Sequence, residues 1–178
     1  MAFAAKSQKL EKPTIDPING DTSISTKKEV IFNKFSIVLD YLSFTINKIS
    51  LPNSASVSYS LVFDIAKGYG SDFTIEKGSA ISIKFTNGKI LELSASLRNN
   101  SQYFHSSGSQ IGTSYVPGSS GYQASAWYNL SMDDIDTLKS NDIVFIRINT
   151  TEAPFDYEIK KKNAEAVKKA LALFNLKK

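Results

Sequence analysis

The 178-residue chain contains no cysteine and only one histidine, His105. The missing thiols exclude disulfide bonds, cysteine nucleophiles and zinc sites that use cysteine ligands. As a proton shuttle, His105 would need a partner that the sequence does not place, so we expect a structural or surface histidine. The remaining ionisable chemistry is that of carboxylates, lysines and phenols.

Arginine is scarce, with only Arg98 and Arg147 beside 19 lysines. Planar, bidentate recognition of phosphate or guanine favours arginine, so this ratio argues against nucleic acid as a partner. Seven lysines and three acidic residues fall in residues 155–178, which therefore carry the whole net charge of +4. We expect these lysines to form the solvated face of a helix and not a membrane-binding surface.

Long apolar runs and metal-binding spacings are also missing. No apolar run approaches the roughly 18 residues that a transmembrane helix requires. The acidic run Asp133, Asp134 and Asp136 lacks the glycine and the glutamate of a calcium-binding loop, and helix capping accounts for two of its members. We therefore expect neither a bound metal ion nor a cofactor.

An enzymatic role would have to rely on paired carboxylates, as in glycoside hydrolysis. No spacing in the sequence singles out a pair among the candidates. These are Asp64, Asp72, Glu76 and Glu92. The sequence therefore favours a protein that is not an enzyme, while a carboxylate-based hydrolase stays an alternative.

Strand patterns dominate what the chain does contain. Residues 57–65 alternate between apolar and polar side chains, which predicts one buried and one wet face, and residues 35–46 are apolar in both phases. Residues 80–97 predict a hairpin. A three-residue loop with a bulge at Gly88 places Ile81 and Ile83 opposite Leu93 and Leu91, so that both strands bury the same side.

Two helices are expected near the end of the chain. Ser131 and Asp134 form a capping box for a short helix at 132–139. Residues 155–176 predict a C-terminal helix with an apolar side and a lysine side. With no alternating βαβ pattern, the fold class is mainly β, a β-sandwich or barrel-like arrangement of antiparallel sheets.

The polar, proline-punctuated residues 1–28 predict an extended N-terminal arm, followed by a single β-rich domain at 29–178 that the C-terminal helix closes. The opening residues Met1–Ser7 lack a basic region and an apolar stretch of useful length, so they do not form a complete signal peptide. They fit either the tail of one or an initiator methionine before a flexible arm. The sequence leaves the localisation of the protein open: it is either exported or part of a viral particle.

Aromatic residues gather around a Gly/Ser-rich segment at 106–121, which we expect to be a long exposed loop. They are Tyr103, Phe104, Tyr115, Tyr122, Trp127 and Tyr128. Such a cluster can stack on sugar rings or dock into a partner, or its members can fill the core. Trp127 and Tyr128 must point to opposite faces of their strand, and we expect Trp127 to contribute more to stability than to binding.

Three segments carry a resemblance. The strings FTNGKILEL, YNLSMDDIDTLKSNDIVFIRINT and FDYEIKKKNAEAVKKAL are together similar to a group of small, often exported, uncharacterised bacterial proteins of β-rich fold. The resemblance covers residues 80–175 and extends to Asp16–Phe32. It implies a hairpin, a capped helix, a strand and a closing helix, favours export, and carries no activity.

The sequence thus predicts a non-enzymatic binding or assembly module whose partner is another protein or further copies of the chain, as in a particle component. The alternative is a carbohydrate-binding β-sandwich that uses the aromatic cluster at 103–128.

Overall fold

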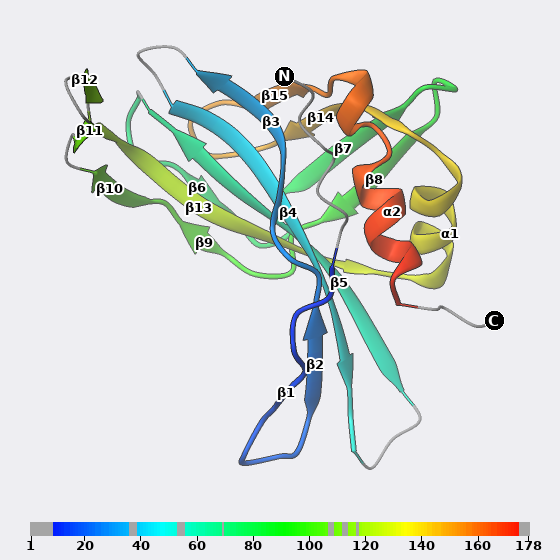
Figure 1. Cartoon of the computed structure of the whole chain (residues 1–178). Coiled ribbons are helices and arrows are strands. Elements are labelled where there is room, and N and C mark those ends of the chain that lie inside the picture. Colours follow the sequence, from blue (N-terminus) through cyan, green and yellow to red (C-terminus); the bar gives the residue numbers. More distant parts are fainter. Residues whose placement is uncertain are drawn as a thin grey trace.

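Two antiparallel sheets packed face to face make up the body of the protein (Figure 1). The computed structural model describes residues 9–35, 39–52, 56–68, 70–106, 109–111, 114–116 and 118–174. Within these residues the chain is mainly β with two short α-helices, which confirms the predicted fold class.

The first sheet has seven strands in the order β1-β2-β4-β5-β13-β10, with β3 paired to β4 beside β2. Its strands are β1 (Thr14–Ile15), β2 (Thr22–Ser25), β3 (Glu29–Phe35), β4 (Leu39–Ser50), β5 (Val57–Lys67), β10 (Gln102–Ser106) and β13 (Ser119–Leu130). The three longest strands, β4, β5 and β13, lie side by side at its centre.

The second sheet has four strands in the order β15-β14-β7-β8. They are β7 (Ala80–Phe85), β8 (Ile90–Ser94), β14 (Ile143–Ile148) and β15 (Phe155–Glu158). Two small pairs join β6 (Thr74–Ile75) to β9 (Asn99–Asn100) and β11 (Ser109–Ile111) to β12 (Ser114–Val116). The helical elements are α1 (Met132–Ser140), the 3-10 turn η1 (Lys161–Asn163) and α2 (Ala166–Ala172).

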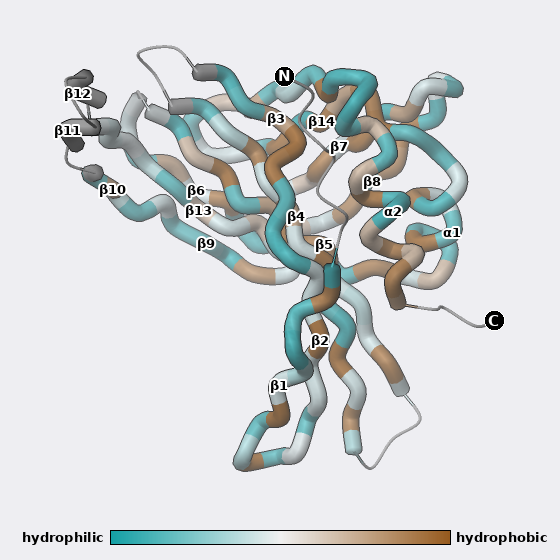
Figure 2. Tube along the Cα trace, viewed as in Figure 1, coloured by the Kyte–Doolittle hydropathy of each residue, from teal (hydrophilic) through white to brown (hydrophobic). Residues whose placement is uncertain are grey.

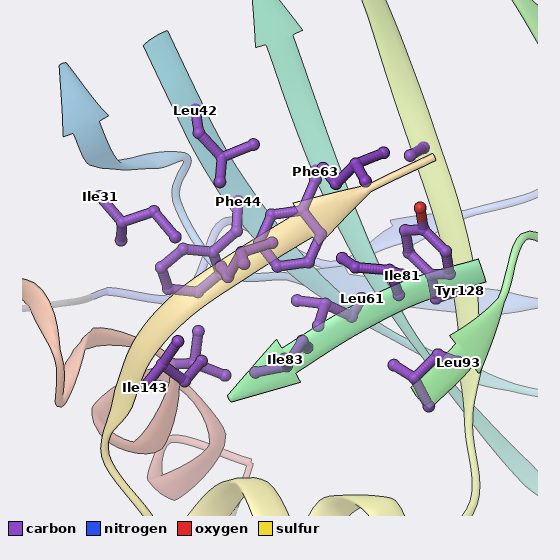
Figure 3. Close-up of a cluster of buried hydrophobic side chains, with 14 of the residues drawn as sticks. Ile31, Leu42, Phe44, Leu61, Phe63, Ile81, Ile83, Leu93, Tyr128 and Ile143 are labelled. Atoms are coloured by element: carbon purple, nitrogen blue, oxygen red, sulfur yellow. The ribbon is translucent and has the colours of Figure 1, made fainter. Parts of the chain in front are cut away.

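The hydrophobic core lies between the two sheets. Figure 3 shows Phe44, Leu61 and Phe63 of the first sheet directed toward Ile81 and Ile83 of the second, and all five are fully buried. Because side chains alternate along a strand, this packing assigns every second residue of β4, β5 and β13 to the core and turns the others to the opposite face.

The predicted hairpin is confirmed in its register and its loop. Ile81 pairs with Leu93 and Ile83 with Leu91, and residues 86–88 connect β7 to β8. Gly88 has a φ of +83°, a left-handed conformation that suits glycine, and its N–H donates to the carbonyl of Phe85 at 3.0 Å. The apolar alternation of the two strands therefore selected the loop length.

The capping box of α1 is also confirmed. The backbone N–H of Asp134 donates to Ser131 Oγ at 3.2 Å, and the backbone N–H of Ser131 donates to Asp134 Oδ2 at 2.9 Å. These two bonds satisfy amide groups that the first helical turn leaves unpaired.

The predicted C-terminal helix at 155–176 is wrong at its beginning. Residues 155–158 form β15, which pairs with β14, and the α-helix runs only from Ala166 to Ala172. The segment alternates inward Phe155 and Tyr157 with outward Asp156, and Arg147 of β14 donates two hydrogen bonds to Asp156 at 2.6 and 2.7 Å. This alternation has a period of two, which is typical of a strand and not of a helix.

The Gly/Ser-rich segment at 106–121, which we expected to be a long loop, contains strands among its described residues. It contains the β11–β12 pair and the beginning of β13, which starts at Ser119. Residues 107, 108, 112, 113 and 117 of this segment lie outside the described residues.

The arm predicted at 1–28 is extended where it is described, from residue 9 onward, and it belongs to the first sheet. β1 pairs with β2, and β2 pairs with the last residues of β4. Figure 1 shows these strands and the adjoining ends of β4 and β5 projecting from the body, and Figure 2 shows apolar segments along the projection. The term projecting arm denotes residues 9–25 together with 47–52 and 56–58.

Replacing Gly121 with alanine should destabilise the protein. An added Cβ would lie 2.0 Å from the carbonyl oxygen of Lys67 and 2.8 Å from Gly68 Cα, so β5 and β13 would have to move apart. We expect a loss of about 1–3 kcal/mol in the free energy of unfolding, measured by urea denaturation. The neighbouring Ser120→Ala serves as control, and a Gly121→Ala protein as stable as that control would contradict the close approach.

Replacing Leu171 with alanine tests whether α2 closes the core. Leu171 and Ala170 are fully buried, so the truncation should cost about 2–5 kcal/mol in thermal or urea unfolding. Lys161→Gln and Lys162→Gln alter exposed side chains and should change stability by less than about 0.5 kcal/mol. Equal effects in the two sets would show that α2 does not pack as described.

Candidate functional site

Three members of the predicted aromatic cluster lie on the core side of the first sheet. Tyr128 is fully buried, and its ring packs edge-on against Phe63 with centroids 6.3 Å apart. Burial raises the pKa of its phenol, so the group stays neutral at physiological pH. Tyr122 is half-buried on the same face and meets Tyr103, a cross-strand neighbour that is 63% exposed, at 5.6 Å between ring centroids.

Phe104 and Trp127 lie on the opposite face of the same strands. Strand alternation places Phe104 beside Gly121 and puts Trp127 one residue out of phase with Tyr128. Both side chains are half-buried, and the opposite orientation of Trp127 and Tyr128 is confirmed. The side chain of Tyr115, the sixth member, lies outside the described residues.

The face of the first sheet that is turned away from the second sheet, here called the outer face, is mostly polar. The strand register sets its residues in rows across β4, β5 and β13. These rows are Tyr41–Ala66–Gln123, Ser43–Asp64–Ser125, Thr45–Val62–Trp127 and Asn47–Ser60–Asn129. The alternation in β5 is evident from the sequence, whereas the alignment of the polar residues of three strands depends on their pairing.

A hollow of about 280 Å³ opens on the outer face beside Asp64. The carboxylate of Asp64 has two polar partners in this hollow. Its Oδ1 accepts a hydrogen bond from Ser125 Oγ at 2.5 Å, and its Oδ2 lies 2.9 Å from Lys28 Nζ. The side chain of Asp64 is only 18% exposed. We call this space the Asp64 hollow; it is lined by Lys28, Tyr41, Asp64, Ile65, Asn99, Asn100, Gln102, Gln123, Ala124 and Ser125.

One wall of the hollow comes from the chain that follows β8. Asn99 Nδ2 donates to the carbonyl of Ser125 at 2.7 Å, and the N–H of Ser96 donates to the carbonyl of Trp127 at 2.7 Å. An isolated bridge joins Ala95 to Tyr128. Residues 95–102 therefore cover the edge of β13 where β10 does not reach.

A second hollow, of about 320 Å³, lies farther along the outer face. It is lined by Ile49, Ser58, Tyr59, Ser60, Ser96, Leu97, Trp127 and Asn129. Trp127 lines this second hollow, and its row across the sheet is next to the row that contains Asp64. The segment at 95–102 contributes to both hollows.

Of the four carboxylates considered for hydrolysis, only Asp64 lines the Asp64 hollow. Glu76 lies 3.4 Å from Arg98 Nε, and Glu92 accepts a hydrogen bond from Ser82. The described residues contain no group of three or more His, Cys, Asp or Glu side chains placed to hold a metal ion. No helix among them is long and apolar enough to cross a membrane.

Comparisons with protein-family models, with curated proteins and with solved structures give no match. The resemblance to small exported bacterial proteins therefore stays a prediction, and functional arguments must come from the chain itself.

Truncation of the adjacent aromatics of β13 should have unequal effects. Tyr128→Ala removes a fully buried ring and should lower the free energy of unfolding by about 3–5 kcal/mol. Trp127→Ala removes a half-buried ring from the outer face, and we expect about 1–2 kcal/mol. Urea denaturation of both variants measures the difference, and an equal loss would contradict the placement of Trp127.

Proposed function

We propose that the protein is an assembly subunit, not an enzyme, and that its projecting arm binds a second copy of the chain. The observation that carries this proposal is that the first sheet continues beyond the second sheet as the projecting arm (Figure 1), where it leaves apolar side chains exposed to solvent. On the side of the arm that continues the core face of the sheet, Ile15, 66% exposed, and Val57, 42% exposed, lie in one row with Thr22 and Ser50 between them.

The turn at the end of the arm adds a further apolar contact. Ile18 is 94% exposed, and the turn that presents it is held by Asp16, whose Oδ1 accepts the N–H groups of Ile18 and Asn19. A rigid turn loses little entropy when it binds. Exposed apolar side chains on an ordered, projecting element are typical of an interface and costly for a protein that stays alone.

Charge supports a second copy as the partner. Residues 13–25 of the arm contain Asp16 and Asp21 but no lysine or arginine. A hollow on the second sheet lies at the opposite end of the molecule from the projecting arm (Figure 1). It is lined by Lys84, Val144, Phe145, Glu158 and Ile159, and three lysines, at 160–162, follow Ile159 in the chain. We call this space the Phe145 hollow. Its apolar floor complements the apolar centre of the turn, and Lys84 together with Lys160, which follows Ile159 in the chain, complements the acidic residues of the turn.

A contact between unlike surfaces at opposite ends is heterologous. Repetition of such a contact produces a ring when the rotation closes and a filament when it does not. The proposed function is therefore that of a self-assembling structural component.

Two variants with separate defects test the proposal. Ile18→Asp damages the arm, and Lys84→Glu with Phe145→Ala damages the Phe145 hollow. We expect the parent to form oligomers and each variant alone to be monomeric, as measured by multi-angle light scattering over a concentration series. Mixed in equal amounts, the two variants should form a dimer and stop, because only one working contact remains.

Met132→Asp is the matched control, because Met132 is 47% exposed on the body, lies outside both the projecting arm and the Phe145 hollow, and should leave the mass unchanged. Thermal melts confirm that each variant is folded. A monomeric parent at every concentration overturns the proposal. Oligomers that survive the variant of the Phe145 hollow but not Ile18→Asp overturn the head-to-tail geometry.

A further inference from the structure

The Asp64 hollow offers hydrogen-bonding groups that both donate and accept. Amide side chains of Asn99, Asn100, Gln102 and Gln123 line it together with the phenol of Tyr41. Within the described part of the chain, Gln102 and Gln123 make no side-chain hydrogen bond, and both are exposed. Each amide presents a donor and an acceptor, which is what a ligand hydroxyl group requires.

The charges of the hollow cancel. Lys28 and Asp64 supply one positive and one negative group, 2.9 Å apart, and no other charged side chain among the described residues lines the space. An anionic ligand such as a phosphate would meet no excess of positive charge, and a cation no excess of negative charge. Asp64 is nevertheless fixed by Ser125 and Lys28, and its carboxylate oxygens retain lone pairs that can accept from a hydroxyl.

An aromatic surface lies next to these groups. Trp127 is two residues from Ser125 on the same face, a distance of about 7 Å along the strand. The second hollow begins near Ser60, four residues from Asp64, which corresponds to about 13 Å. The residues at 95–102 form a wall common to both hollows.

We propose that the outer face binds a neutral carbohydrate, with its hydroxyl groups in the Asp64 hollow and the apolar side of a ring against Trp127. Sugar rings combine a polar circumference with apolar faces, so amide, carboxylate and indole groups on one surface match their chemistry. Separate hollows on either side of Trp127 favour an oligosaccharide over a single sugar. No residue that lines the Asp64 hollow belongs to the projecting arm, so the proposal does not rest on assembly.

The experiment begins with the full chain on an array of neutral oligosaccharides, including glucans, mannans and galactans, with sulfated and sialylated glycans for comparison. The strongest neutral ligand is then titrated by calorimetry. Gln123→Ala should weaken binding about five- to tenfold, the value of one hydrogen bond. Trp127→Ala should weaken the binding of longer oligosaccharides more than the binding of short ones.

Controls keep stability apart from binding. Asn33→Ala removes an exposed amide from β3, and Tyr103→Ala removes an exposed aromatic ring from the other face, so both should leave the dissociation constant unchanged. Thermal melts identify any variant that is not folded, and Gln123→Asn then repeats the test with a smaller change. No binding to any neutral glycan, binding to the charged glycans alone, or a loss of binding in Tyr103→Ala but not Gln123→Ala overturns the proposal.

Discussion

Burial of one face of β4, β5 and β13 against the second sheet is the interaction on which the rest of the structure depends. The pairing of β4 with β5 continues for ten residues in register, from Tyr41 with Ala66 to Ser50 with Val57. The second sheet and α2 cover only the first part of that pairing, because the strands of the second sheet are shorter than β4 and β5. Within the described residues the remaining part has regular hydrogen bonds but no apolar layer above it, and β1 and β2 add to its edge. The projecting arm thus results from strands β4 and β5 that extend beyond the hydrophobic core.

The same burial also determines the chemistry of the outer face. Once Phe63 and Leu61 point inward, the register leaves Asp64 beside Ser43 and Ser125, since neighbours on one face of a sheet are brought opposite one another. A shift of one residue in either neighbouring strand would replace these partners by core side chains. The carboxylate therefore keeps its hydrogen bond from Ser125 only while the core register holds. The hollow and the core are two consequences of one pairing, even though they lie on opposite sides of the sheet.

The sequence predicted those features that depend on local patterns. The alternation around Gly88 was sufficient for the hairpin, and Ser131 with Asp134 was sufficient for the capped helix. The prediction from the sequence failed at residues 155–158. The lysines that follow these residues suggested a longer amphipathic helix, and the period of two was overlooked. The Asp64 hollow was not predictable, because it combines Lys28, Asp64, Asn99 and Ser125 from four separate segments. Only the pairing of distant strands brings these residues together, and periodicity within one strand carries no information about that pairing.

The segment at 95–102 connects the two sheets in an additional way. It leaves β8 of the second sheet and lies along β13 of the first, where Ser96 donates to the carbonyl of Trp127 and Asn99 donates to that of Ser125. The sandwich is therefore closed along this edge by main-chain hydrogen bonds as well as by side-chain packing. To separate the sheets, the protein must first pull this segment away from β13. Any molecule held between the segment and β5 would resist that step, so occupancy of the outer face would lower the unfolding rate of the whole domain.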